Sequence, residues 1–295
     1  MQNRTSKAQF ATILGIIVNI VLAIVKGIAG VIANSRALIA DALHSASDIV
    51  SSIAVLIGIR AAQKPPDSEH PYGHGKAENI AALIVAIILI IVGFEIMLDS
   101  IRAIWENNLD KTGILSLYVI IFSIIAKELL YQYKYRLGKK INSPALVADA
   151  WHHRSDAFSS VIALIGIGLA IIGNEMNLSY FQLFDPIAGA LIAIIIMWMG
   201  FKIAKDAVSV TLETVLNEEE TEPYVHTTYG VDGVKRIDGL YARTHGSYVI
   251  IDIKISVNPT ITVDEGHDIA VKVREKLLDI HDDVQDVHVH VNPYH

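Results

Sequence analysis

The chain contains no cysteine, and only 19% of its 295 residues are charged. Without cysteine, disulfide frameworks, cysteine-ligated zinc or iron–sulfur sites and thiol nucleophiles are all excluded. Hydrophobic residues make up 52% of the chain, which is too many for an ordinary soluble domain and far too many for a disordered one. The composition therefore indicates a protein that lies largely in a membrane.

The charges are distributed unevenly along the chain. Residues 1–205 contain 17 Lys and Arg against 14 Asp and Glu, whereas residues 206–295 contain 7 against 17, together with seven of the 12 histidines. An acidic end makes nucleic acid an unfavourable partner, because phosphate binding requires positive charge. Such an end suits divalent cations instead. We expect a membrane domain over 1–206 and a soluble, metal-binding domain over 207–295.

Six segments are apolar enough to cross a bilayer, which takes about 20 residues each. They are roughly 10–33, 37–61, 79–103, 113–134, 145–173 and 183–204. The second and the fifth contain His and Asp, and they qualify only if these side chains face the interior of a helix bundle. With the N-terminus inside the cell, the outer connections hold few basic residues, namely Arg36, Arg102 and Lys111. We therefore predict a multi-pass protein of the cell (plasma) membrane with both termini in the cytoplasm.

Beyond the last span, alternating strand patterns replace the long apolar runs. Residues 234–243, 248–257 and 284–291 are predicted as strands. Residues 217–230 and 263–281 are predicted as helices. The order predicts an α+β domain with the pattern αββαβ after an all-α bundle of six membrane helices. Because so small a domain buries little core, association of two copies would stabilise it.

An internal repeat places the same polar residues in the second and the fifth span. Residues 37–59 and 145–167 are identical at 14 of 23 positions, at a constant offset of 108 and without a gap. A shift by three helices makes the two copies antiparallel across the membrane. Duplicated units of opposite topology, with polar sites near the bilayer midplane, are typical of secondary transporters.

The polar residues that the two copies share form one stripe on each helix. They are Asp41, His44 and Asp48 in the first copy and Asp149, His152 and Asp156 in the second. Residues three and four apart lie on the same helical face, so each His–Asp pair can bind one ion. Two facing pairs would supply two imidazoles and two carboxylates, which suits tetrahedral Zn²⁺. Asp41 and Asp149 could instead orient the imidazoles by a hydrogen bond, or add further oxygen ligands.

The alternative is that these groups only bond to one another inside the bundle. One buried Asp costs roughly 2.5–3.5 kcal/mol to insert, so four duplicated ones favour a cation site. Other polar residues occur singly in the spans, and for these we expect helix packing, snorkelling or an interface position. They are Asn19, Lys26, Glu95 and Asp99.

With His-x-x-x-Asp at 44–48 and 152–156, and HPYGHGKAE at 70–78, the chain resembles the cation diffusion facilitator family along nearly its whole length. Members of that family are divalent metal/proton antiporters. The resemblance implies six helices, a cytoplasmic ferredoxin-like domain and a homodimer. It also implies a divalent metal as substrate and protons as counter-substrate, with no organic cofactor and no enzymatic activity.

The loop after the second span contains a second candidate site, Asp67, His70 and His74. The two histidines are four residues apart, and the family resemblance implies a peripheral metal bound by one Asp and two His. A solvated histidine pair is the alternative.

For the C-terminal domain, the resemblance implies a metal site at the dimer interface. The matching positions are Asp238, Asp252, His267 and His290, with Asn292 where some relatives have Asp. The resemblance also implies a charge contact between subunits that involves Lys76 and Asp206.

We therefore expect export of a divalent transition metal in exchange for protons. Metal ligands must be deprotonated, so protons and metal compete for the same atoms, and an ordinary imidazole pKa of about 6.5 places this competition in the physiological range. Mixed nitrogen and oxygen ligands favour zinc, while manganese, iron, cobalt and cadmium stay open. A metal-sensing membrane protein and a membrane-embedded metalloenzyme are the alternatives. The enzyme would need an open coordination position, and no H-E-x-x-H signature occurs in the sequence.

Overall fold

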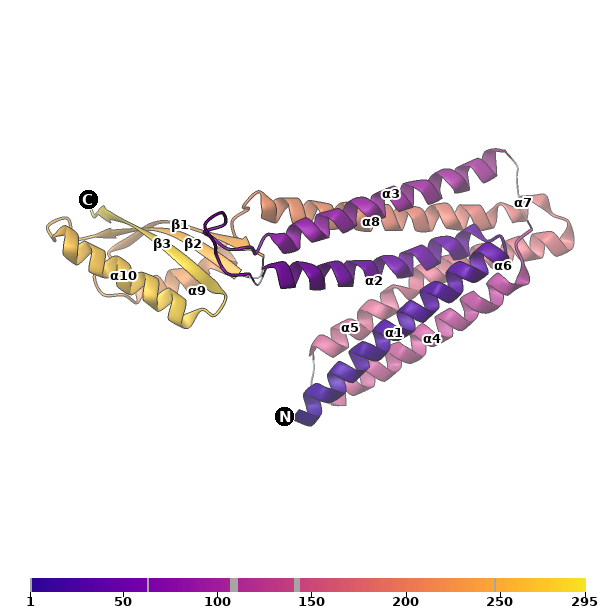
Figure 1. Cartoon of the computed structure of the whole chain (residues 1–295), viewed down its shortest axis with the longest axis horizontal. Coiled ribbons are helices and arrows are strands. Elements are labelled where there is room, and N and C mark those ends of the chain that lie inside the picture. Colours follow the sequence, from indigo (N-terminus) through magenta and orange to yellow (C-terminus); the bar gives the residue numbers. More distant parts are fainter. Residues whose placement is uncertain (1, 63, 107–110, 141–143, 247) are drawn as a thin grey trace. The chain divides into compact units, whose positions relative to one another are not determined.

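The structure, a computed structural model, describes residues 2–62, 64–106, 111–140, 144–246 and 248–295 (Figure 1). Among these, the side chains of 2–9, 51–52, 54–56, 59, 62, 144–145, 148, 152 and 179 are not described. The chain forms two compact units. The first consists of Met1–Ile53 with Val85–Lys202, and the second of Ala54–Ile84 with Ile203–His295.

The first unit is built from long helices, some of which continue into the second. The helices are α1 (Gln2–Ile32), α2 (Arg36–Ala62), α3 (Ala77–Trp105), α4 (Ile114–Lys140), α5 (Pro144–Ser155), α6 (Ala157–Met176), α7 (Ser179–Gln182) and α8 (Phe184–Thr211). α1 packs on α4, and α4 packs on α5 and α6. α3 and α8 lie side by side (Figure 1), so close that a Cβ added at Gly93 would lie 2.7 Å from Met197 Cγ.

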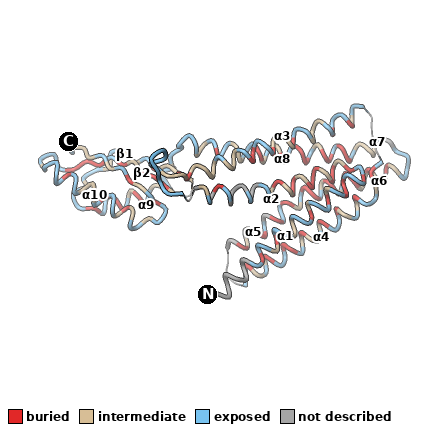
Figure 2. The backbone as a smooth tube through the Cα atoms, viewed as in Figure 1, coloured by how far each residue is buried: buried red, intermediate tan, exposed pale blue. Residues whose placement is uncertain are grey.

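Apolar side chains point away from these helices, and several charged ones point inward. Ile84, Ile88 and Ile91 of α3 are about half exposed, whereas Lys26 and Lys134 are almost completely buried. Buried and exposed positions alternate around the helices (Figure 2). Monomeric soluble proteins rarely expose apolar surface on this scale, but a bilayer requires it.

Five helices are long and apolar enough to cross a membrane, counting only the described residues. They are Phe10–Ile32, Ala77–Trp105, Ile114–Lys140, Asp149–Met176 and Tyr180–Thr211. They match five of the six predicted spans. The remaining predicted span corresponds to α2, which carries a polar stripe but has 27 residues. At 1.5 Å per residue its length of about 40 Å exceeds the hydrocarbon thickness of about 30 Å.

The fifth predicted span is built from two helices rather than one. α5 ends at Ser155 and α6 begins at Ala157, with Asp156 between them. The carbonyl oxygen of Asp156 accepts a hydrogen bond from Lys127 Nζ at 3.2 Å, and Ser159 Oγ lies 2.9 Å from it. Side chains that insert into the backbone ladder interrupt a helix at that point. Asp156 therefore occupies the N-terminal end of α6.

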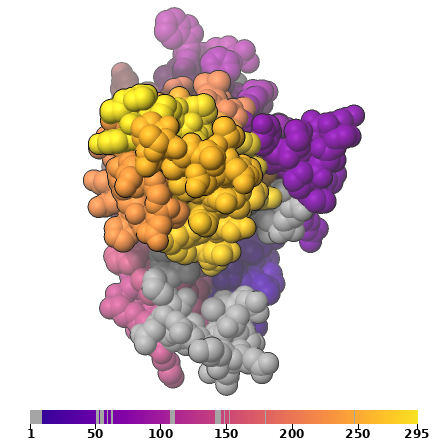
Figure 3. Space-filling model, turned by 90° about the vertical axis from the view of Figure 1, so that its left-hand side faces the viewer, coloured from indigo at the N-terminus to yellow at the C-terminus, as the bar shows by residue number. Residues whose placement is uncertain are grey.

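The second unit contains the predicted α+β domain. Its elements are α9 (Glu218–Tyr229), β1 (Arg236–His245), β2 (Tyr248–Val257), α10 (Val263–Ile280) and β3 (Val284–Pro293). β2 is the central strand, antiparallel to β1 and parallel to β3. α9 (orange) and α10 (golden) lie side by side on one face of the sheet (Figures 1 and 3). The predicted order αββαβ is confirmed.

The core of this domain lies between the sheet and its helices. Ile251, Ile253 and Ile255 of β2 pack with Val273 and Leu277 of α10, and all five are buried. Residues two apart on a strand share a face, which explains why β2 can direct three isoleucines at one helix. Both helices begin at capping boxes, which fix their first turns and hence their position on the sheet.

Candidate metal centre

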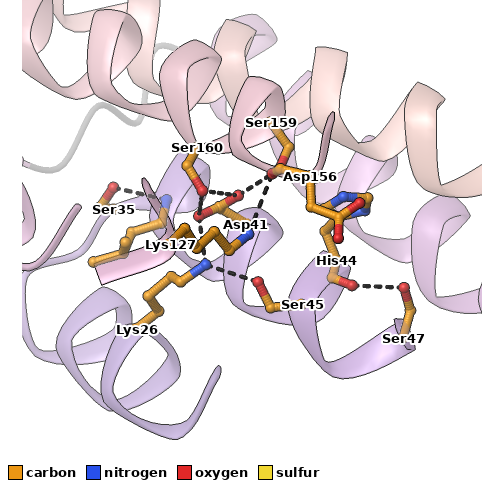
Figure 4. Close-up of polar contacts among 11 residues, drawn as sticks. Lys26, Ser35, Asp41, His44, Ser45, Ser47, Lys127, Asp156, Ser159 and Ser160 are labelled. Atoms are coloured by element: carbon orange, nitrogen blue, oxygen red, sulfur yellow. Dashed lines mark hydrogen bonds and ion pairs between the residues drawn. The ribbon is translucent and has the colours of Figure 1, made fainter. Parts of the chain in front are cut away.

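Three of the four residues predicted for the membrane site come together in the first unit. His44 and Asp48 lie one turn apart on α2, and Asp156 lies at the start of α6. One ligand atom from each lies within 4.8 Å of the others. His44 is 3% exposed and Asp156 is 8% exposed, and Figure 4 shows the Asp156 carboxylate beside the His44 ring. Two carboxylates and one imidazole in a largely buried position can hold a divalent cation.

A buried nitrogen in this group supports a ligand role. Nδ1 of His44 is buried and makes no hydrogen bond within the described part of the chain. Buried side-chain polar atoms nearly always have a partner, so this nitrogen is available to a cation held by the group. The side chain of His152, the fourth predicted ligand, lies outside the described residues, and its role stays a prediction.

Asp41, one turn before His44, makes a different set of contacts. Its carboxylate is fully buried and accepts hydrogen bonds from Lys26 Nζ at 2.8 Å and from Ser159 Oγ at 2.8 Å. Ser160 Oγ lies 2.9 and 3.1 Å from its two oxygens. These oxygens are therefore directed at protein donors. The structure thus places Asp41 beside the centre without making it a ligand.

The second copy of the repeat contains a related contact. Asp149 on α5 accepts a hydrogen bond from Lys134 Nζ at 2.7 Å, and Lys134 Nζ also lies 2.8 Å from His153 Nε2. The Asp149 side chain is 33% exposed, in contrast to the fully buried Asp41. Asp149 is therefore also paired with a lysine.

The three residues predicted for the loop site also lie together. In the second unit, Asp67, His70 and His74 each offer a ligand atom within 4.8 Å of the others. Asp67 Oδ2 lies 3.3 Å from His74 Nε2, and the two imidazole rings are 4.5 Å apart between centroids. The backbone N–H groups of His70 and Glu69 donate to Asp67 and lower the pKa of this carboxyl below its ordinary value. The carboxylate is thus charged and ready for a cation.

The four positions implied for a C-terminal site are not brought together in one copy of the chain. Asp238 accepts hydrogen bonds from Ser256, Asn292 and Arg236, which lower its pKa to about 2. Within the described residues, three potential ligands come together only at the membrane centre and in the loop.

The other implied positions have different neighbours. Asp252 forms an ion pair with Arg243 at 2.8 Å, and His290 pairs in register with Lys254 of β2. His267 lies on α10, where it lines a shallow groove. A metal site shared by two subunits at these positions stays a prediction.

Lys76 has a partner within its own chain. Its Nζ lies 2.9 Å from Glu213 Oε1, and this hydrogen bond lowers the pKa of Glu213. The inter-subunit contact of Lys76 with Asp206, implied by the resemblance, stays a prediction.

Sequence reasoning missed the buried lysines around the membrane centre. Lys26 neither snorkels to the membrane surface nor lies at an interface, because its side chain is completely buried against Asp41. Lys127 and Lys134 are also buried, on α4. The sequence does mark two of these lysines, Lys26 and Lys134, because the repeat offset of 108 places them at matching positions.

Together, the spanning helices, the buried His–Asp group and the α+β domain define a class of protein. This is a polytopic membrane transporter for metal cations with a soluble C-terminal domain.

Comparison with known proteins shows the family. Residues 12–212 match the transmembrane domain of cation efflux proteins, and residues 216–294 match the cytoplasmic domain of the same proteins. The chain therefore belongs to the cation efflux family, the cation diffusion facilitators that its sequence resembles.

Several relatives are similar over most of their length. The manganese efflux system protein MneP of Bacillus subtilis is 40% identical, over 96% of this chain and 95% of its own. The uncharacterized transporter YdbO of Bacillus subtilis is 38% identical, over 97% and 96%. Metal tolerance protein C1 of Arabidopsis thaliana is 35% identical, over 95% and 61%. A nickel form of the MamM C-terminal domain is 24% identical and covers 27% of this chain and all of its own, with a TM-score of 0.26.

The family membership confirms several of the predictions. The protein is a multi-pass membrane transporter rather than an enzyme, and it acts in the efflux of divalent metal cations. Its cytoplasmic domain supports the formation of a homodimer.

Proposed function

We propose that this protein exports Mn²⁺ from the cytoplasm in exchange for protons, with Zn²⁺ as the second candidate. The observation that carries the proposal is the group of His44, Asp48 and Asp156 among the helices, with His44 and Asp156 buried and Asp48 half-buried. Two carboxylates and one imidazole form an oxygen-rich set, and carboxylates suit Mn²⁺.

The choice between the two metals depends on the fourth ligand and on the relatives. Two relatives, MneP and MneS of Bacillus subtilis, are named as manganese efflux proteins. Zinc, the metal that the sequence favours, would gain from a second imidazole if His152 completes the set. Iron, cobalt and cadmium rank below these two.

The same atoms account for exchange with protons. A carboxylate or imidazole binds either a metal ion or a proton, so binding of the metal releases protons and protonation displaces the metal. A site that opens to one side of the membrane at a time would therefore move the two in opposite directions. No separate proton pathway is needed.

We further propose that all six predicted spans cross the cell membrane, with both termini in the cytoplasm. This orientation leaves Arg36, Arg102 and Lys111 on the outer side and most other basic residues of the connections on the inner side. It also places the Asp67–His70–His74 group in the cytoplasm, where it would meet the metal before export.

Flux into proteoliposomes tests this function. Purified protein is reconstituted with an internal pH indicator and an internal metal indicator, and Mn²⁺ and Zn²⁺ are added in separate series. We expect metal influx coupled to proton efflux, with Mn²⁺ the better substrate. Asp48→Ala and Asp156→Ala should each abolish both signals, because each removes one ligand.

Glu95→Ala serves as the matched control, since Glu95 is an exposed carboxylate on a spanning helix. Undiminished flux in both Asp variants would refute the proposal. Metal binding without flux in the wild-type protein would instead favour a metal sensor.

A further inference from the structure

A fully buried ion pair lies directly beside the candidate metal centre. Lys26 of α1 and Asp41 of α2 are 2.8 Å apart, and neither side chain is exposed at all (Figure 4). Removing two charges from water is costly, and a buried pair is retained at this cost only when further hydrogen bonds satisfy both groups. Lys26 has such a second bond, to Ser45 Oγ at 2.7 Å.

The carboxylate of Asp41 joins two helices that carry metal ligands. Besides Lys26, its donors are Ser159 and Ser160, which lie in the first turn of α6. Asp156 immediately precedes that turn, and His44 lies one turn after Asp41 on α2. The hydrogen bonds from the two serines therefore set how far Asp156 stands from His44.

A second lysine holds the same turn from another side. Lys127 of α4 donates to the backbone oxygen of Asp156 at 3.2 Å. The start of α6 is thus bonded to α2 through Asp41 and to α4 through Lys127. Asp156 has helical backbone angles between α5 and α6, and these bonds add to the constraint on its position.

The lysine–aspartate pair is duplicated together with the metal ligands. In both copies the two residues are 15 apart in sequence, Lys26 with Asp41 and Lys134 with Asp149. Comparing residues 10–32 with 118–140, the two copies differ at most positions, and the lysine is the one polar residue that they share. The second partner of the lysine also corresponds, since Ser45 matches His153 at the same offset.

We propose that Lys26, Asp41, Ser159 and Ser160 form a positioning clamp that sets the geometry of the metal centre and thereby its affinity for a divalent cation. The inference rests on the proposed function, because it concerns the same centre. The clamp residues touch no substrate. They act through Asp156, which they hold against the ligands of α2.

Two variants of the full-length protein separate positioning from mere stability. Ser159→Ala with Ser160→Ala removes the donors on α6 and leaves the ion pair intact. Lys26→Met with Asp41→Asn removes both charges together, so that no unpaired charge is left buried. The control is Ser100→Ala with Ser116→Ala, which removes two equally buried serines that make no contact with Asp41.

The primary measurement is the Kd for Mn²⁺ alone, obtained by calorimetry on purified protein in detergent, with the thermal midpoint recorded for each variant. We expect the Kd to rise about tenfold to a hundredfold in both clamp variants, as when groups that orient metal ligands are lost. The control variant should keep the wild-type Kd. In flux assays the clamp variants should show a raised KM.

Wild-type Kd in a serine variant that keeps its thermal midpoint would overturn the clamp. If the charge-free variant does not fold, the serine variant alone decides. The proposed function would fail on a different result. In that case the wild-type protein would bind Mn²⁺ through Asp156 but would move no protons. Because the clamp is judged by affinity, the two failures can be told apart.

Discussion

Asp238 shows how a single residue in the C-terminal domain connects stability to pH. Hydrogen bonds from Ser256, Asn292 and Arg236 stabilise its charged form and lower its pKa to about 2. An aspartate in an unfolded chain has a pKa of about 3.9. The stabilisation is therefore complete above about pH 4 and is lost as the pH falls towards 2.

We accordingly expect Asp238→Asn to weaken the sheet at neutral pH. Amide hydrogen exchange in β1 and β3 should be faster than in the wild type at pH 7, and the difference should shrink between about pH 4 and 2. The exposed Asp232, replaced by Asn, is the control. A difference of constant size at every pH would show that Asp238 acts other than through its charge.

At the scale of single residues, the sequence predicts the members of the candidate centre better than their surroundings. His44, Asp48 and Asp156 could be found because the repeat marks them and because spacings of four residues fix a helical face. The contact of Lys26 with Asp41 could not be found from local spacing, since it joins two helices. Only the packing of α1 against its neighbours decides whether such a lysine snorkels or is buried.

Among the helices, close packing of α6 on α8 depends on a glycine. A Cβ at Gly166 would meet the Cβ of Ala188 and lie 2.7 Å from the carbonyl oxygen of Phe184. Two residues further on, a Cβ at Gly168 would meet nothing within 4 Å. Small residues at helix contacts allow such approach in membranes.

The two glycines therefore give opposite predictions for the same substitution. Gly166→Ala should lower the thermal stability of the detergent-solubilised protein, since overpacking costs about 1–3 kcal/mol and outweighs the gain in helix propensity of about 1 kcal/mol. Gly168→Ala should leave it unchanged or raise it slightly. Equal melting temperatures for the two variants would contradict the close contact of α6 with α8.

The elements themselves are predicted well where the pattern is local. The strand predicted at 248–257 is β2 with the same bounds, because its alternating isoleucines mark it and turn residues flank it. The helix predicted at 263–281 differs from α10 by one residue. The division of the fifth span at Asp156 was not predicted. At that point Lys127 of α4 donates to the carbonyl oxygen of Asp156, a contact that no pattern within 145–173 can report.

For the whole molecule, the number of crossings decides where the two ends lie. Five helices qualify as spans by hydropathy among the described residues, and α2, several of whose side chains lie outside the described residues, is not one of them. Five crossings would put the termini on opposite sides of the membrane, whereas six put them on the same side. The metal centre favours six, since His44 and Asp48 of α2 lie with Asp156 of the membrane bundle.

The absence of cysteine makes this count directly testable. Single cysteines placed at Asn34, Ser68, Asn177 and Tyr294 can be labelled in intact cells with a membrane-impermeant maleimide, without any background from the protein. We expect labelling of Asn34→Cys and Asn177→Cys from outside, and of Ser68→Cys and Tyr294→Cys only after the cells are opened. If α2 did not cross, Asn34→Cys and Ser68→Cys would be labelled from the same side. Since α2 carries half of the proposed ligands, that result would remove the centre from the membrane and with it the route for the metal.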